Sequence, residues 1–194
     1  MSAAEPIRNS QKLQDFKNYY LSEKCNARNY TLFVMGLNTA LRISDLLQLQ
    51  WKDVYDFSRE TCFSHVCVTE QKTGKTNQIA LNQAIIDALG NYYGILKEAP
   101  SGEHFLFPSR KGNNRPLGRS QAFRIVKEAA RANGMNQHIS CHSLRKTFGY
   151  HAWRQGVSSV LLTDIYNHSS FRITKRYLGI EQDDRDNIFL NISL

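Results

Sequence analysis

Four residues in the last third of the chain have side chains suited to binding a phosphate group and moving a proton. They are His142, Arg145, His168 and Tyr177. Arg presents a planar fork of donors that matches two phosphate oxygens, and His can donate a hydrogen bond or transfer a proton near neutral pH. Because His142 and Arg145 are three positions apart, a helix beginning near Ser143 would present both on one face. Such a pair suits a phosphate.

The positions of His168 and Tyr177 predict a break between two helices. The two residues are nine positions apart, which on one uninterrupted helix would turn them about 180° away from each other. The residues 167–170, Asn-His-Ser-Ser, are common in turns and helix caps. We therefore predict that one helix ends near Tyr166 and that a new helix carries Tyr177 back toward the site.

The composition is typical of a folded domain that binds a polyanion. The chain has 194 residues, 41% hydrophobic and 22% charged, which suits one domain with a single core. Its net charge is +8, and clustered Lys and Arg gain affinity for nucleic acid by displacing counterions. Four acidic residues against one Arg give residues 181–194 a net charge of −3, which leaves +11 for residues 1–180. The tail is therefore chemically distinct from the body.

The sequence predicts a cytosolic protein with reduced cysteines. The N-terminus lacks the apolar core of a signal peptide, and no stretch approaches the ~20 apolar residues of a membrane-spanning helix. There is no CxxC pair, so we expect free, mostly buried thiols at Cys25, Cys62, Cys67 and Cys141. Cys62, His65 and Cys67 could suggest zinc, but in a strand the two cysteines would point to opposite faces. No metal site is predicted.

Hydrophobic periodicity predicts a mainly helical α+β domain with a small antiparallel β element. Apolar residues at helical spacing predict helices within residues 10–22, 27–40, 82–96 and 120–132. Alternating residues around the KTGKTN turn predict a β-hairpin or small sheet within 53–81, and 100–118 resembles a loop. In the helix that follows this loop, Phe123, Val126 and Ala130 are expected to face the core.

Arg42 lies between Leu41 and Ile43 in an otherwise apolar stretch, TALRISDLLQLQW. Burying a guanidinium is costly unless it has a partner. Asp45, three residues further on, could hold it in place. Taken alone, the two residues fit an ordinary Arg–Asp pair on a helix surface better than a functional site.

Basic residues gather at two predicted loops. Lys72 and Lys75 flank the hairpin turn, where exposed Lys often serves only solubility but could also reach into a DNA groove. The later loop and the start of the next helix carry Arg110, Lys111 and Arg119. We treat Lys75 and these three residues as candidates for contact with the phosphate backbone.

Six of these residues together resemble the motif set of the tyrosine recombinases, also called the phage integrase family. The matching pieces are Arg42 in TALRISDLLQLQW, Lys72 in the KTGK turn, His142 and Arg145 as H-x-x-R, His168 in NHSS, and Tyr177 in TKRYLGI. Their order and spacing are like the family's over residues 27–180. The resemblance implies the mainly helical catalytic domain of that family, with a small antiparallel sheet.

The chain departs from the family pattern in two places. Many members have Gly before the third-motif His, where this chain has Asn167, which also tolerates left-handed backbone. Most integrases carry a core-binding domain before the catalytic domain, and here about 26 residues precede the match. The chain resembles the small, catalytic-domain-only members, such as the fimbrial-switch invertases, or a fragment of a larger integrase.

The resemblance implies that Tyr177 attacks a scissile DNA phosphate, leaving a 3′-phosphotyrosyl link and a free 5′-hydroxyl. A second strand's hydroxyl then reverses the step, so neither ATP nor a metal cofactor is expected. His142 would move the Tyr177 proton and Lys72 would protonate the leaving oxygen. The charge on the non-bridging oxygens would be stabilised by Arg42, Arg145 and His168.

Three other functions are alternatives to recombination. A type IB topoisomerase-like enzyme would use nearly the same chemistry and rejoin the same strand. A catalytically silent DNA-binding regulator would not need all six residues. A metal-dependent nuclease would need several carboxylates, and Asp164 is the only one between Cys141 and Leu178.

We expect a catalytic domain over residues 1–180 and a separate tail over residues 181–194. The apolar residues of the tail need a groove in which to be buried. They are Ile188, Phe189, Leu190, Ile192 and Leu194. The groove could belong to the tail's own domain or, as the resemblance implies, to a neighbouring protomer. The expected partners are double-stranded DNA, further copies of the chain on DNA, and accessory DNA-bending proteins.

Overall fold

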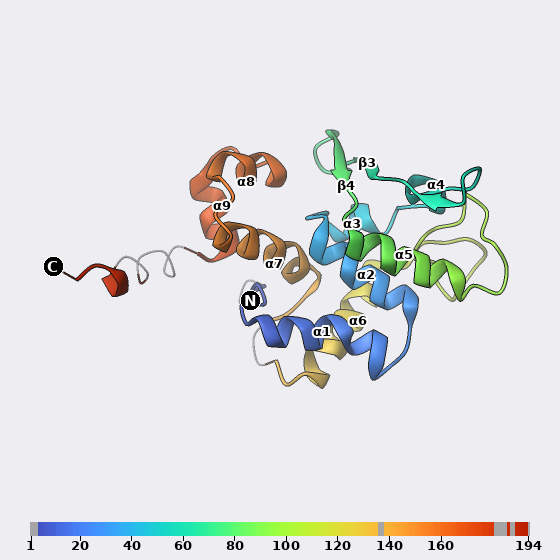
Figure 1. Ribbon diagram of the computed structural model, residues 1–194, viewed down its shortest axis with the longest axis horizontal. Helices are drawn as coiled ribbons and strands as arrows, with labels where there is room; N and C mark the ends of the chain where they lie inside the picture. The colour runs from blue at the N-terminus through green and yellow to red at the C-terminus, as the bar shows by residue number, and fades with distance from the viewer. Residues whose placement is uncertain (1–3, 136–137, 181–185, 187–188, 194) are drawn as a thin grey trace.

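A helical scaffold built around one central helix forms the body of the protein. The computed structural model describes residues 4–135, 138–180, 186 and 189–193. The scaffold helices are α1 (Ser10–Ser22), α2 (Ala27–Asn38), α5 (Gln83–Gly94), α6 (Arg119–Ala132) and α7 (Cys141–Arg154). Helix α2 packs against α1, α5 and α7, as Figure 1 shows.

The sequence of α2 explains its central place. Its N-cap, Asn26, accepts a hydrogen bond from the Asn29 backbone N–H at 3.0 Å, and residues 31–37 are all buried. Phe33 stacks on Phe16 of α1 with ring centroids 4.6 Å apart. A Cβ added to Gly36 would lie 2.8 Å from the Leu144 side chain, so glycine allows α7 to approach closely. This contact fixes the helix that carries two of the candidate residues.

The segment between α2 and α5 contains two short antiparallel pairs. After α3 (Ile43–Leu46) and α4 (Trp51–Val54), β1 (Tyr55–Asp56) pairs with β2 (Thr61–Cys62), and β3 (His65–Thr69) pairs with β4 (Thr76–Ala80). In β3, Val66 and Val68 are buried while their neighbours are exposed, as the alternation predicted. The predicted hairpin is confirmed, and its turn projects at the top of Figure 1.

The C-terminal part confirms the predicted break. Helix α8 (Ser159–Tyr166) ends at Asn167, whose left-handed φ of 56° turns the chain, and α9 (Phe171–Leu178) returns beside it. A Cβ on Gly149 of α7 would lie 2.6 Å from the Leu178 side chain, so glycine again permits close packing. A small second core unites these helices through Ala40, Tyr150, Leu162, Tyr166, Leu178 and Ile180.

Three details differ from the predictions. Helix α7 begins at Cys141 rather than near Ser143, because the Ser140 backbone N–H donates to the Ser143 hydroxyl and starts the helix earlier. Phe123 is 41% exposed instead of facing the core, since the apolar stripe of α6 runs through its neighbours Ala122, Ile125, Val126, Ala129 and Ala130. The thiols are less buried than expected, with Cys25 and Cys67 exposed and Cys62 and Cys141 only partly buried.

The described part of the tail extends away from the body in Figure 1. Phe189 and Leu190 are each 82% exposed, and Ile192 is also exposed. Ile188 and Leu194, which the sequence grouped with them, lie outside the described residues. Among the described residues, no helix combines the length and apolarity needed to cross a membrane.

Candidate catalytic site

Arg145 of α7 lies at the centre of the site and is held through both ends of its guanidinium. Nη1 donates to the carbonyl of Ala40, and Nη2 donates to the carbonyl of Tyr166 at 3.3 Å. The guanidinium also lies 4.6 Å over the Tyr166 ring, whose hydroxyl donates to the Arg145 carbonyl at 2.5 Å. The side chain is buried, yet Arg keeps its charge in proteins. The result is a fixed positive charge.

Ala40 contributes to this arrangement through an unusual backbone. Its φ of 54° lies in the left-handed region, which costs a residue with a Cβ about 1–2 kcal/mol. This conformation follows α2 and aims the carbonyl at Arg145. Strained backbone of this kind is common where a side chain must be positioned for function.

Arg42 forms its ion pair with Glu70, not with Asp45 as predicted. Arg42 Nη1 and Glu70 Oε2 are 2.5 Å apart, and the Glu70 side chain is 1% exposed. Asp45 instead accepts the backbone N–H of Gln71 at 3.2 Å. Burial alone would raise the pKa of Glu70, but hydrogen bonds from Arg42, Thr73 and Asn167 outweigh it and lower the pKa. Glu70 is therefore ionised and holds Arg42 in place.

The pKa of both candidate histidines is lowered, which favours the neutral rings near pH 7, although His142 is exposed and His168 is only half-buried. Desolvation, followed by the charges of Lys146, Arg145 and Arg42, lowers the pKa of His142. Desolvation and then Arg145, Arg42 and Lys72 lower the pKa of His168. Each ring can accordingly accept or donate a proton rather than carry a permanent charge.

Tyr177 of α9 packs its ring among other aromatic side chains. The centroid of the His168 ring lies 5.3 Å away, edge to face, and that of Tyr166 lies 5.4 Å away. Burial raises the pKa of Tyr177, and the charges of Arg145 and Arg42 oppose that shift without cancelling it. The phenol is thus protonated at neutral pH and needs a base to become a nucleophile.

Lys72 lies at the rim of this cluster. It is exposed in the turn between β3 and β4, and its charge reaches His168, whose pKa it helps to lower. Lys75, on the other side of the same turn, has a protein partner, because its Nζ donates to the Asn167 side-chain oxygen at 2.6 Å. The structure thus brings together five of the six motif residues, namely Arg42, His142, Arg145, His168 and Tyr177. The sixth, Lys72, is close enough to act on His168 through its charge.

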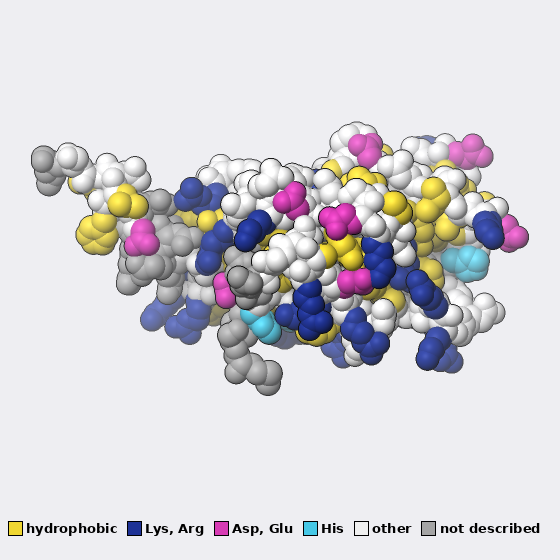
Figure 2. Space-filling view, turned by 90° about the horizontal axis from the view of Figure 1, so that it is seen from below, with side chains coloured by type: hydrophobic (Ala, Val, Ile, Leu, Met, Phe, Trp, Pro, Cys, Tyr) yellow, Lys and Arg dark blue, Asp and Glu magenta, His cyan; other side chains and the backbone are white. Residues whose placement is uncertain are grey.

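The remaining candidates for DNA contact lie elsewhere. Arg110 and Lys111 are exposed in the loop before α6, and Arg119 is exposed at its first turn. The charge of Arg110 acts on Lys24 and Arg28, at the end of α1 and start of α2. Figure 2 shows many Lys and Arg side chains on the face that carries α1 and α6. Their contact with DNA stays a prediction.

Three residues near the site were not identified from the sequence. Glu70 continues the inward alternation of Val66 and Val68, and an acidic residue at such a position could have indicated a buried Arg partner. Lys146, 8% exposed, places its Nζ 4.8 Å over the Tyr177 ring. The side chain of Asn167 contacts the hairpin turn. Nothing in the local pattern points to the last two contacts.

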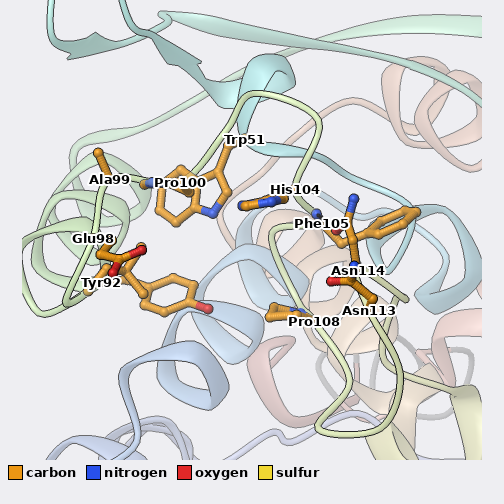
Figure 3. Close-up of a pocket in the computed structure, with 11 residues that line it drawn as sticks. Trp51, Tyr92, Glu98, Ala99, Pro100, His104, Phe105, Pro108, Asn113 and Asn114 are labelled. Carbon is orange, nitrogen blue, oxygen red and sulfur yellow. Dashed lines mark hydrogen bonds between the residues drawn. The ribbon is translucent and has the colours of Figure 1, made fainter.

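A cavity of about 320 Å³ lies apart from this cluster. Figure 3 shows Trp51, Tyr92, His104 and Phe105 around it, and its lining includes none of the six motif residues. The aromatic side chains belong largely to the core beside α5, where Trp51 packs against Tyr92 at 5.4 Å. The cavity has no role in the chemistry described above.

Comparison with known proteins identifies the family. The chain matches the Phage integrase family over residues 8–183. It is 41% identical over 183 residues to the probable integrase/recombinase YoeC of Bacillus subtilis strain 168. The matched residues make up 94% of this chain and 93% of that protein. The chain spans about half the length of two further curated relatives, both named as tyrosine recombinases, at 52% and 48%.

Solved structures share the fold. The crystal structure of XerA recombinase has a TM-score of 0.75 at 18% identity, covering 99% of this chain and 68% of that one. The Tn1549 transposon integrase, in complex with a circular intermediate DNA, has a TM-score of 0.68 at 24% identity, covering 91% and 62%. With the family match spanning most of its length, this chain belongs to the phage integrase family of site-specific tyrosine recombinases.

Proposed function

We propose that Tyr177 is the nucleophile with which this recombinase cleaves one strand of double-stranded DNA. The supporting observation is that two arginines and two mostly neutral histidines lie around one half-buried phenol. In the proposed step, the Tyr177 oxygen forms a bond to phosphorus while the bond from phosphorus to the bridging 5′-oxygen breaks. The products are a 3′-phosphotyrosyl link and a 5′-hydroxyl, and the reverse step rejoins a strand.

Arg42, Arg145 and His168 stabilise the charge that develops on the non-bridging oxygens. Both arginines are fixed before DNA arrives, Arg145 by two backbone carbonyls and Arg42 by Glu70. His168 Nδ1 lies 3.0 Å from the Thr174 hydroxyl. With that hydroxyl as donor, the ring carries its proton on Nε2 and can donate it to a phosphate oxygen. Preorganised donors of this kind usually contribute the largest share of catalysis.

His142 and Lys72 handle the two protons of the reaction. His142, neutral because of desolvation and nearby cations, takes the proton that Tyr177 loses on attack. Lys72 gives a proton to the bridging 5′-oxygen as it leaves, so that it departs as a hydroxyl. The proton count therefore balances with residues of this chain, and the proposed step uses neither ATP nor metal.

Self-association on DNA is a further part of the proposal. Phe189, Leu190 and Ile192 are exposed, and burying each such side chain would contribute about 1.5–3 kcal/mol. We propose that residues 181–194 dock on a neighbouring protomer when several copies bind DNA, since head-to-tail contacts of this kind can close into a ring. Accessory DNA-bending proteins stay a prediction of the family resemblance.

The experiment that tests the nucleophile is covalent capture of DNA. The recombination site is first mapped by sequencing covalent protein–DNA junctions in a host that expresses the chain. A nicked duplex carrying that site is then incubated with the protein in EDTA and analysed on a denaturing gel. We expect a shifted band with the wild-type protein and none with Tyr177→Phe. A band that persists in Tyr177→Phe, or that appears only with magnesium, would contradict the assignment.

A further inference from the structure

The side chain of Asn167 connects two parts of the site that are far apart in sequence. Its backbone serves as the left-handed cap of α8, with φ 56° and ψ 43°. Glycine adopts this conformation at no steric cost, so the cap does not require the amide. The amide instead reaches the turn between β3 and β4, more than 90 residues earlier in the chain.

Both ends of the amide are used at that turn. The Asn167 oxygen accepts from Lys75 Nζ at 2.6 Å, and the nitrogen donates to the Thr73 hydroxyl at 3.3 Å and to Glu70 at 3.5 Å. These three partners flank Lys72 on both sides in the sequence. The α8–α9 junction and the turn are thereby joined next to His168.

Glu70 and its partner Arg42 are also held by bonds that do not involve Asn167. The Thr73 hydroxyl donates to Glu70 at 2.7 Å, the Gly74 N–H donates to the Glu70 carbonyl at 2.8 Å, and Glu70 pairs with Arg42. Lys72 itself is exposed. Val66 and Val68 anchor β3 in the core, whereas residues 71–76 of the turn are exposed, so the Asn167 bonds tie the turn itself to the site.

We propose that Asn167 is a positioning residue that fastens the β3–β4 turn to the α8–α9 junction and so places Lys72 to protonate the leaving 5′-oxygen. The inference rests on the role proposed above for Lys72. It predicts that losing the amide impairs one chemical event, protonation of the leaving group, and spares the residues that stabilise charge. A general loss of stability would impair every event alike.

The test compares Asn167→Gly with a matched variant, Asn114→Gly. Glycine preserves the left-handed cap at residue 167 while removing the amide. Asn114 also has a left-handed φ, 42°, and its amide also makes two bonds, with the Phe105 N–H and the Glu103 carbonyl. It therefore controls for the loss of any bridging asparagine.

Each variant is assayed in single-turnover cleavage on two versions of the mapped site, one with the natural bridging 5′-oxygen and one with sulfur in its place. A thiolate leaves without a proton, so the sulfur substrate bypasses the general acid. We expect Asn167→Gly to cleave the oxygen substrate about tenfold or more slowly, since small misplacements of a catalytic group have effects of this size. On the sulfur substrate it should match the wild-type protein within about twofold.

Three outcomes separate the possibilities. Wild-type-like cleavage of the oxygen substrate by Asn167→Gly, or equal slowing on both substrates, would overturn the positioning role. The same oxygen-to-sulfur difference in Asn114→Gly would also overturn it. If Lys72→Ala gains nothing from sulfur, the role of Lys72 in the proposed function is wrong instead.

Amide hydrogen exchange measures the stability of the turn independently of DNA cleavage. The amides of Glu70 and Gly74 are bonded within the turn. Asn167→Gly should speed their exchange at least about threefold while leaving the α2 amides unchanged, because local opening reports local contacts. Unchanged exchange at Glu70 and Gly74 would also count against the fastening.

Discussion

Arg145 and Lys72, to which we assign different catalytic roles, are held in opposite ways. Arg145 is buried, with its guanidinium fixed by carbonyls from two parts of the chain. Lys72 is exposed on a hairpin turn that reaches the site through side-chain hydrogen bonds. Charge stabilisation depends on donors that are in place before reaction, whereas a proton donor must only reach the leaving oxygen in time. Rigidity in this site therefore follows the chemical task.

A substitution at Arg145 tests most directly whether its fixed geometry is needed for cleavage. Arg145→Lys keeps the charge but cannot make both backbone contacts and the stacking on Tyr166 at once. We expect single-turnover cleavage to fall by about 10²–10³-fold, as for loss of one oxyanion donor, on the oxygen and sulfur substrates alike. Circular dichroism and a thermal melt confirm that the variant is folded. A loss of less than about tenfold would show that the fixed geometry matters little.

A second variant pair tests the exposed side of the comparison. Lys72→Ala should slow cleavage of the oxygen substrate by about 10²-fold, because general acid catalysis has effects of this order, and sulfur should restore it. Lys75→Ala, on the same turn, should show a smaller loss because Lys75 acts by binding Asn167. If the sulfur substrate restores cleavage by Lys75→Ala and not by Lys72→Ala, then Lys75 rather than Lys72 is the general acid.

The tail offers another exposed region to set against the buried Arg145. Deleting residues 186–194 should abolish higher-order complexes on DNA while changing single-protomer binding by less than about threefold, because the exposed tail is proposed to act only between copies. A native gel-shift titration measures both, and a thermal melt of the free protein gives the control. Unfolding of the truncated protein, or full assembly without the tail, would place the tail in its own domain's core.

The smallest predicted effect concerns pH. The lowered pKa of His142 places the acid limb of the cleavage rate below pH 6.5, where protonation of the base slows attack by Tyr177. Lys146→Met removes one nearby cation, so the pKa of His142 should rise and the limb should move to higher pH. Lys146 is not among the groups that shift His168. An unmoved limb would mean that another group controls it.

Elements with long apolar stripes could be predicted from the sequence, as could the break at Asn167. The α2 stripe and the turn residues after Tyr166 are local signals, and both gave the observed helices. The six motif residues were named as a set from the resemblance to a known family, and their roles stay proposals. The stripe of α6 was misjudged at Phe123 because the helical phase was set by a few residues.

Contacts that span long sequence separations could not be read from local patterns. Asp45 was chosen for Arg42 because it lies three positions away, yet the partner is Glu70, 28 positions away on another element. The bonds from Asn167 to Thr73 and Lys75 depend in the same way on how α8 packs beside the hairpin. Local spacing favours near partners, and tertiary packing decides among distant ones.

The anchoring of Arg145 also links cleavage to the integrity of the fold. Its two carbonyl partners belong to Ala40, just after α2, and to Tyr166, at the end of α8. If the α8–α9 pair detaches, Tyr177 leaves the site and Arg145 loses one of its two anchors in the same event. A partly unfolded chain therefore lacks both the proposed nucleophile in its place and an aligned guanidinium that can donate hydrogen bonds to the phosphate. For an enzyme that cleaves DNA, this coupling means that a partly unfolded copy is inert.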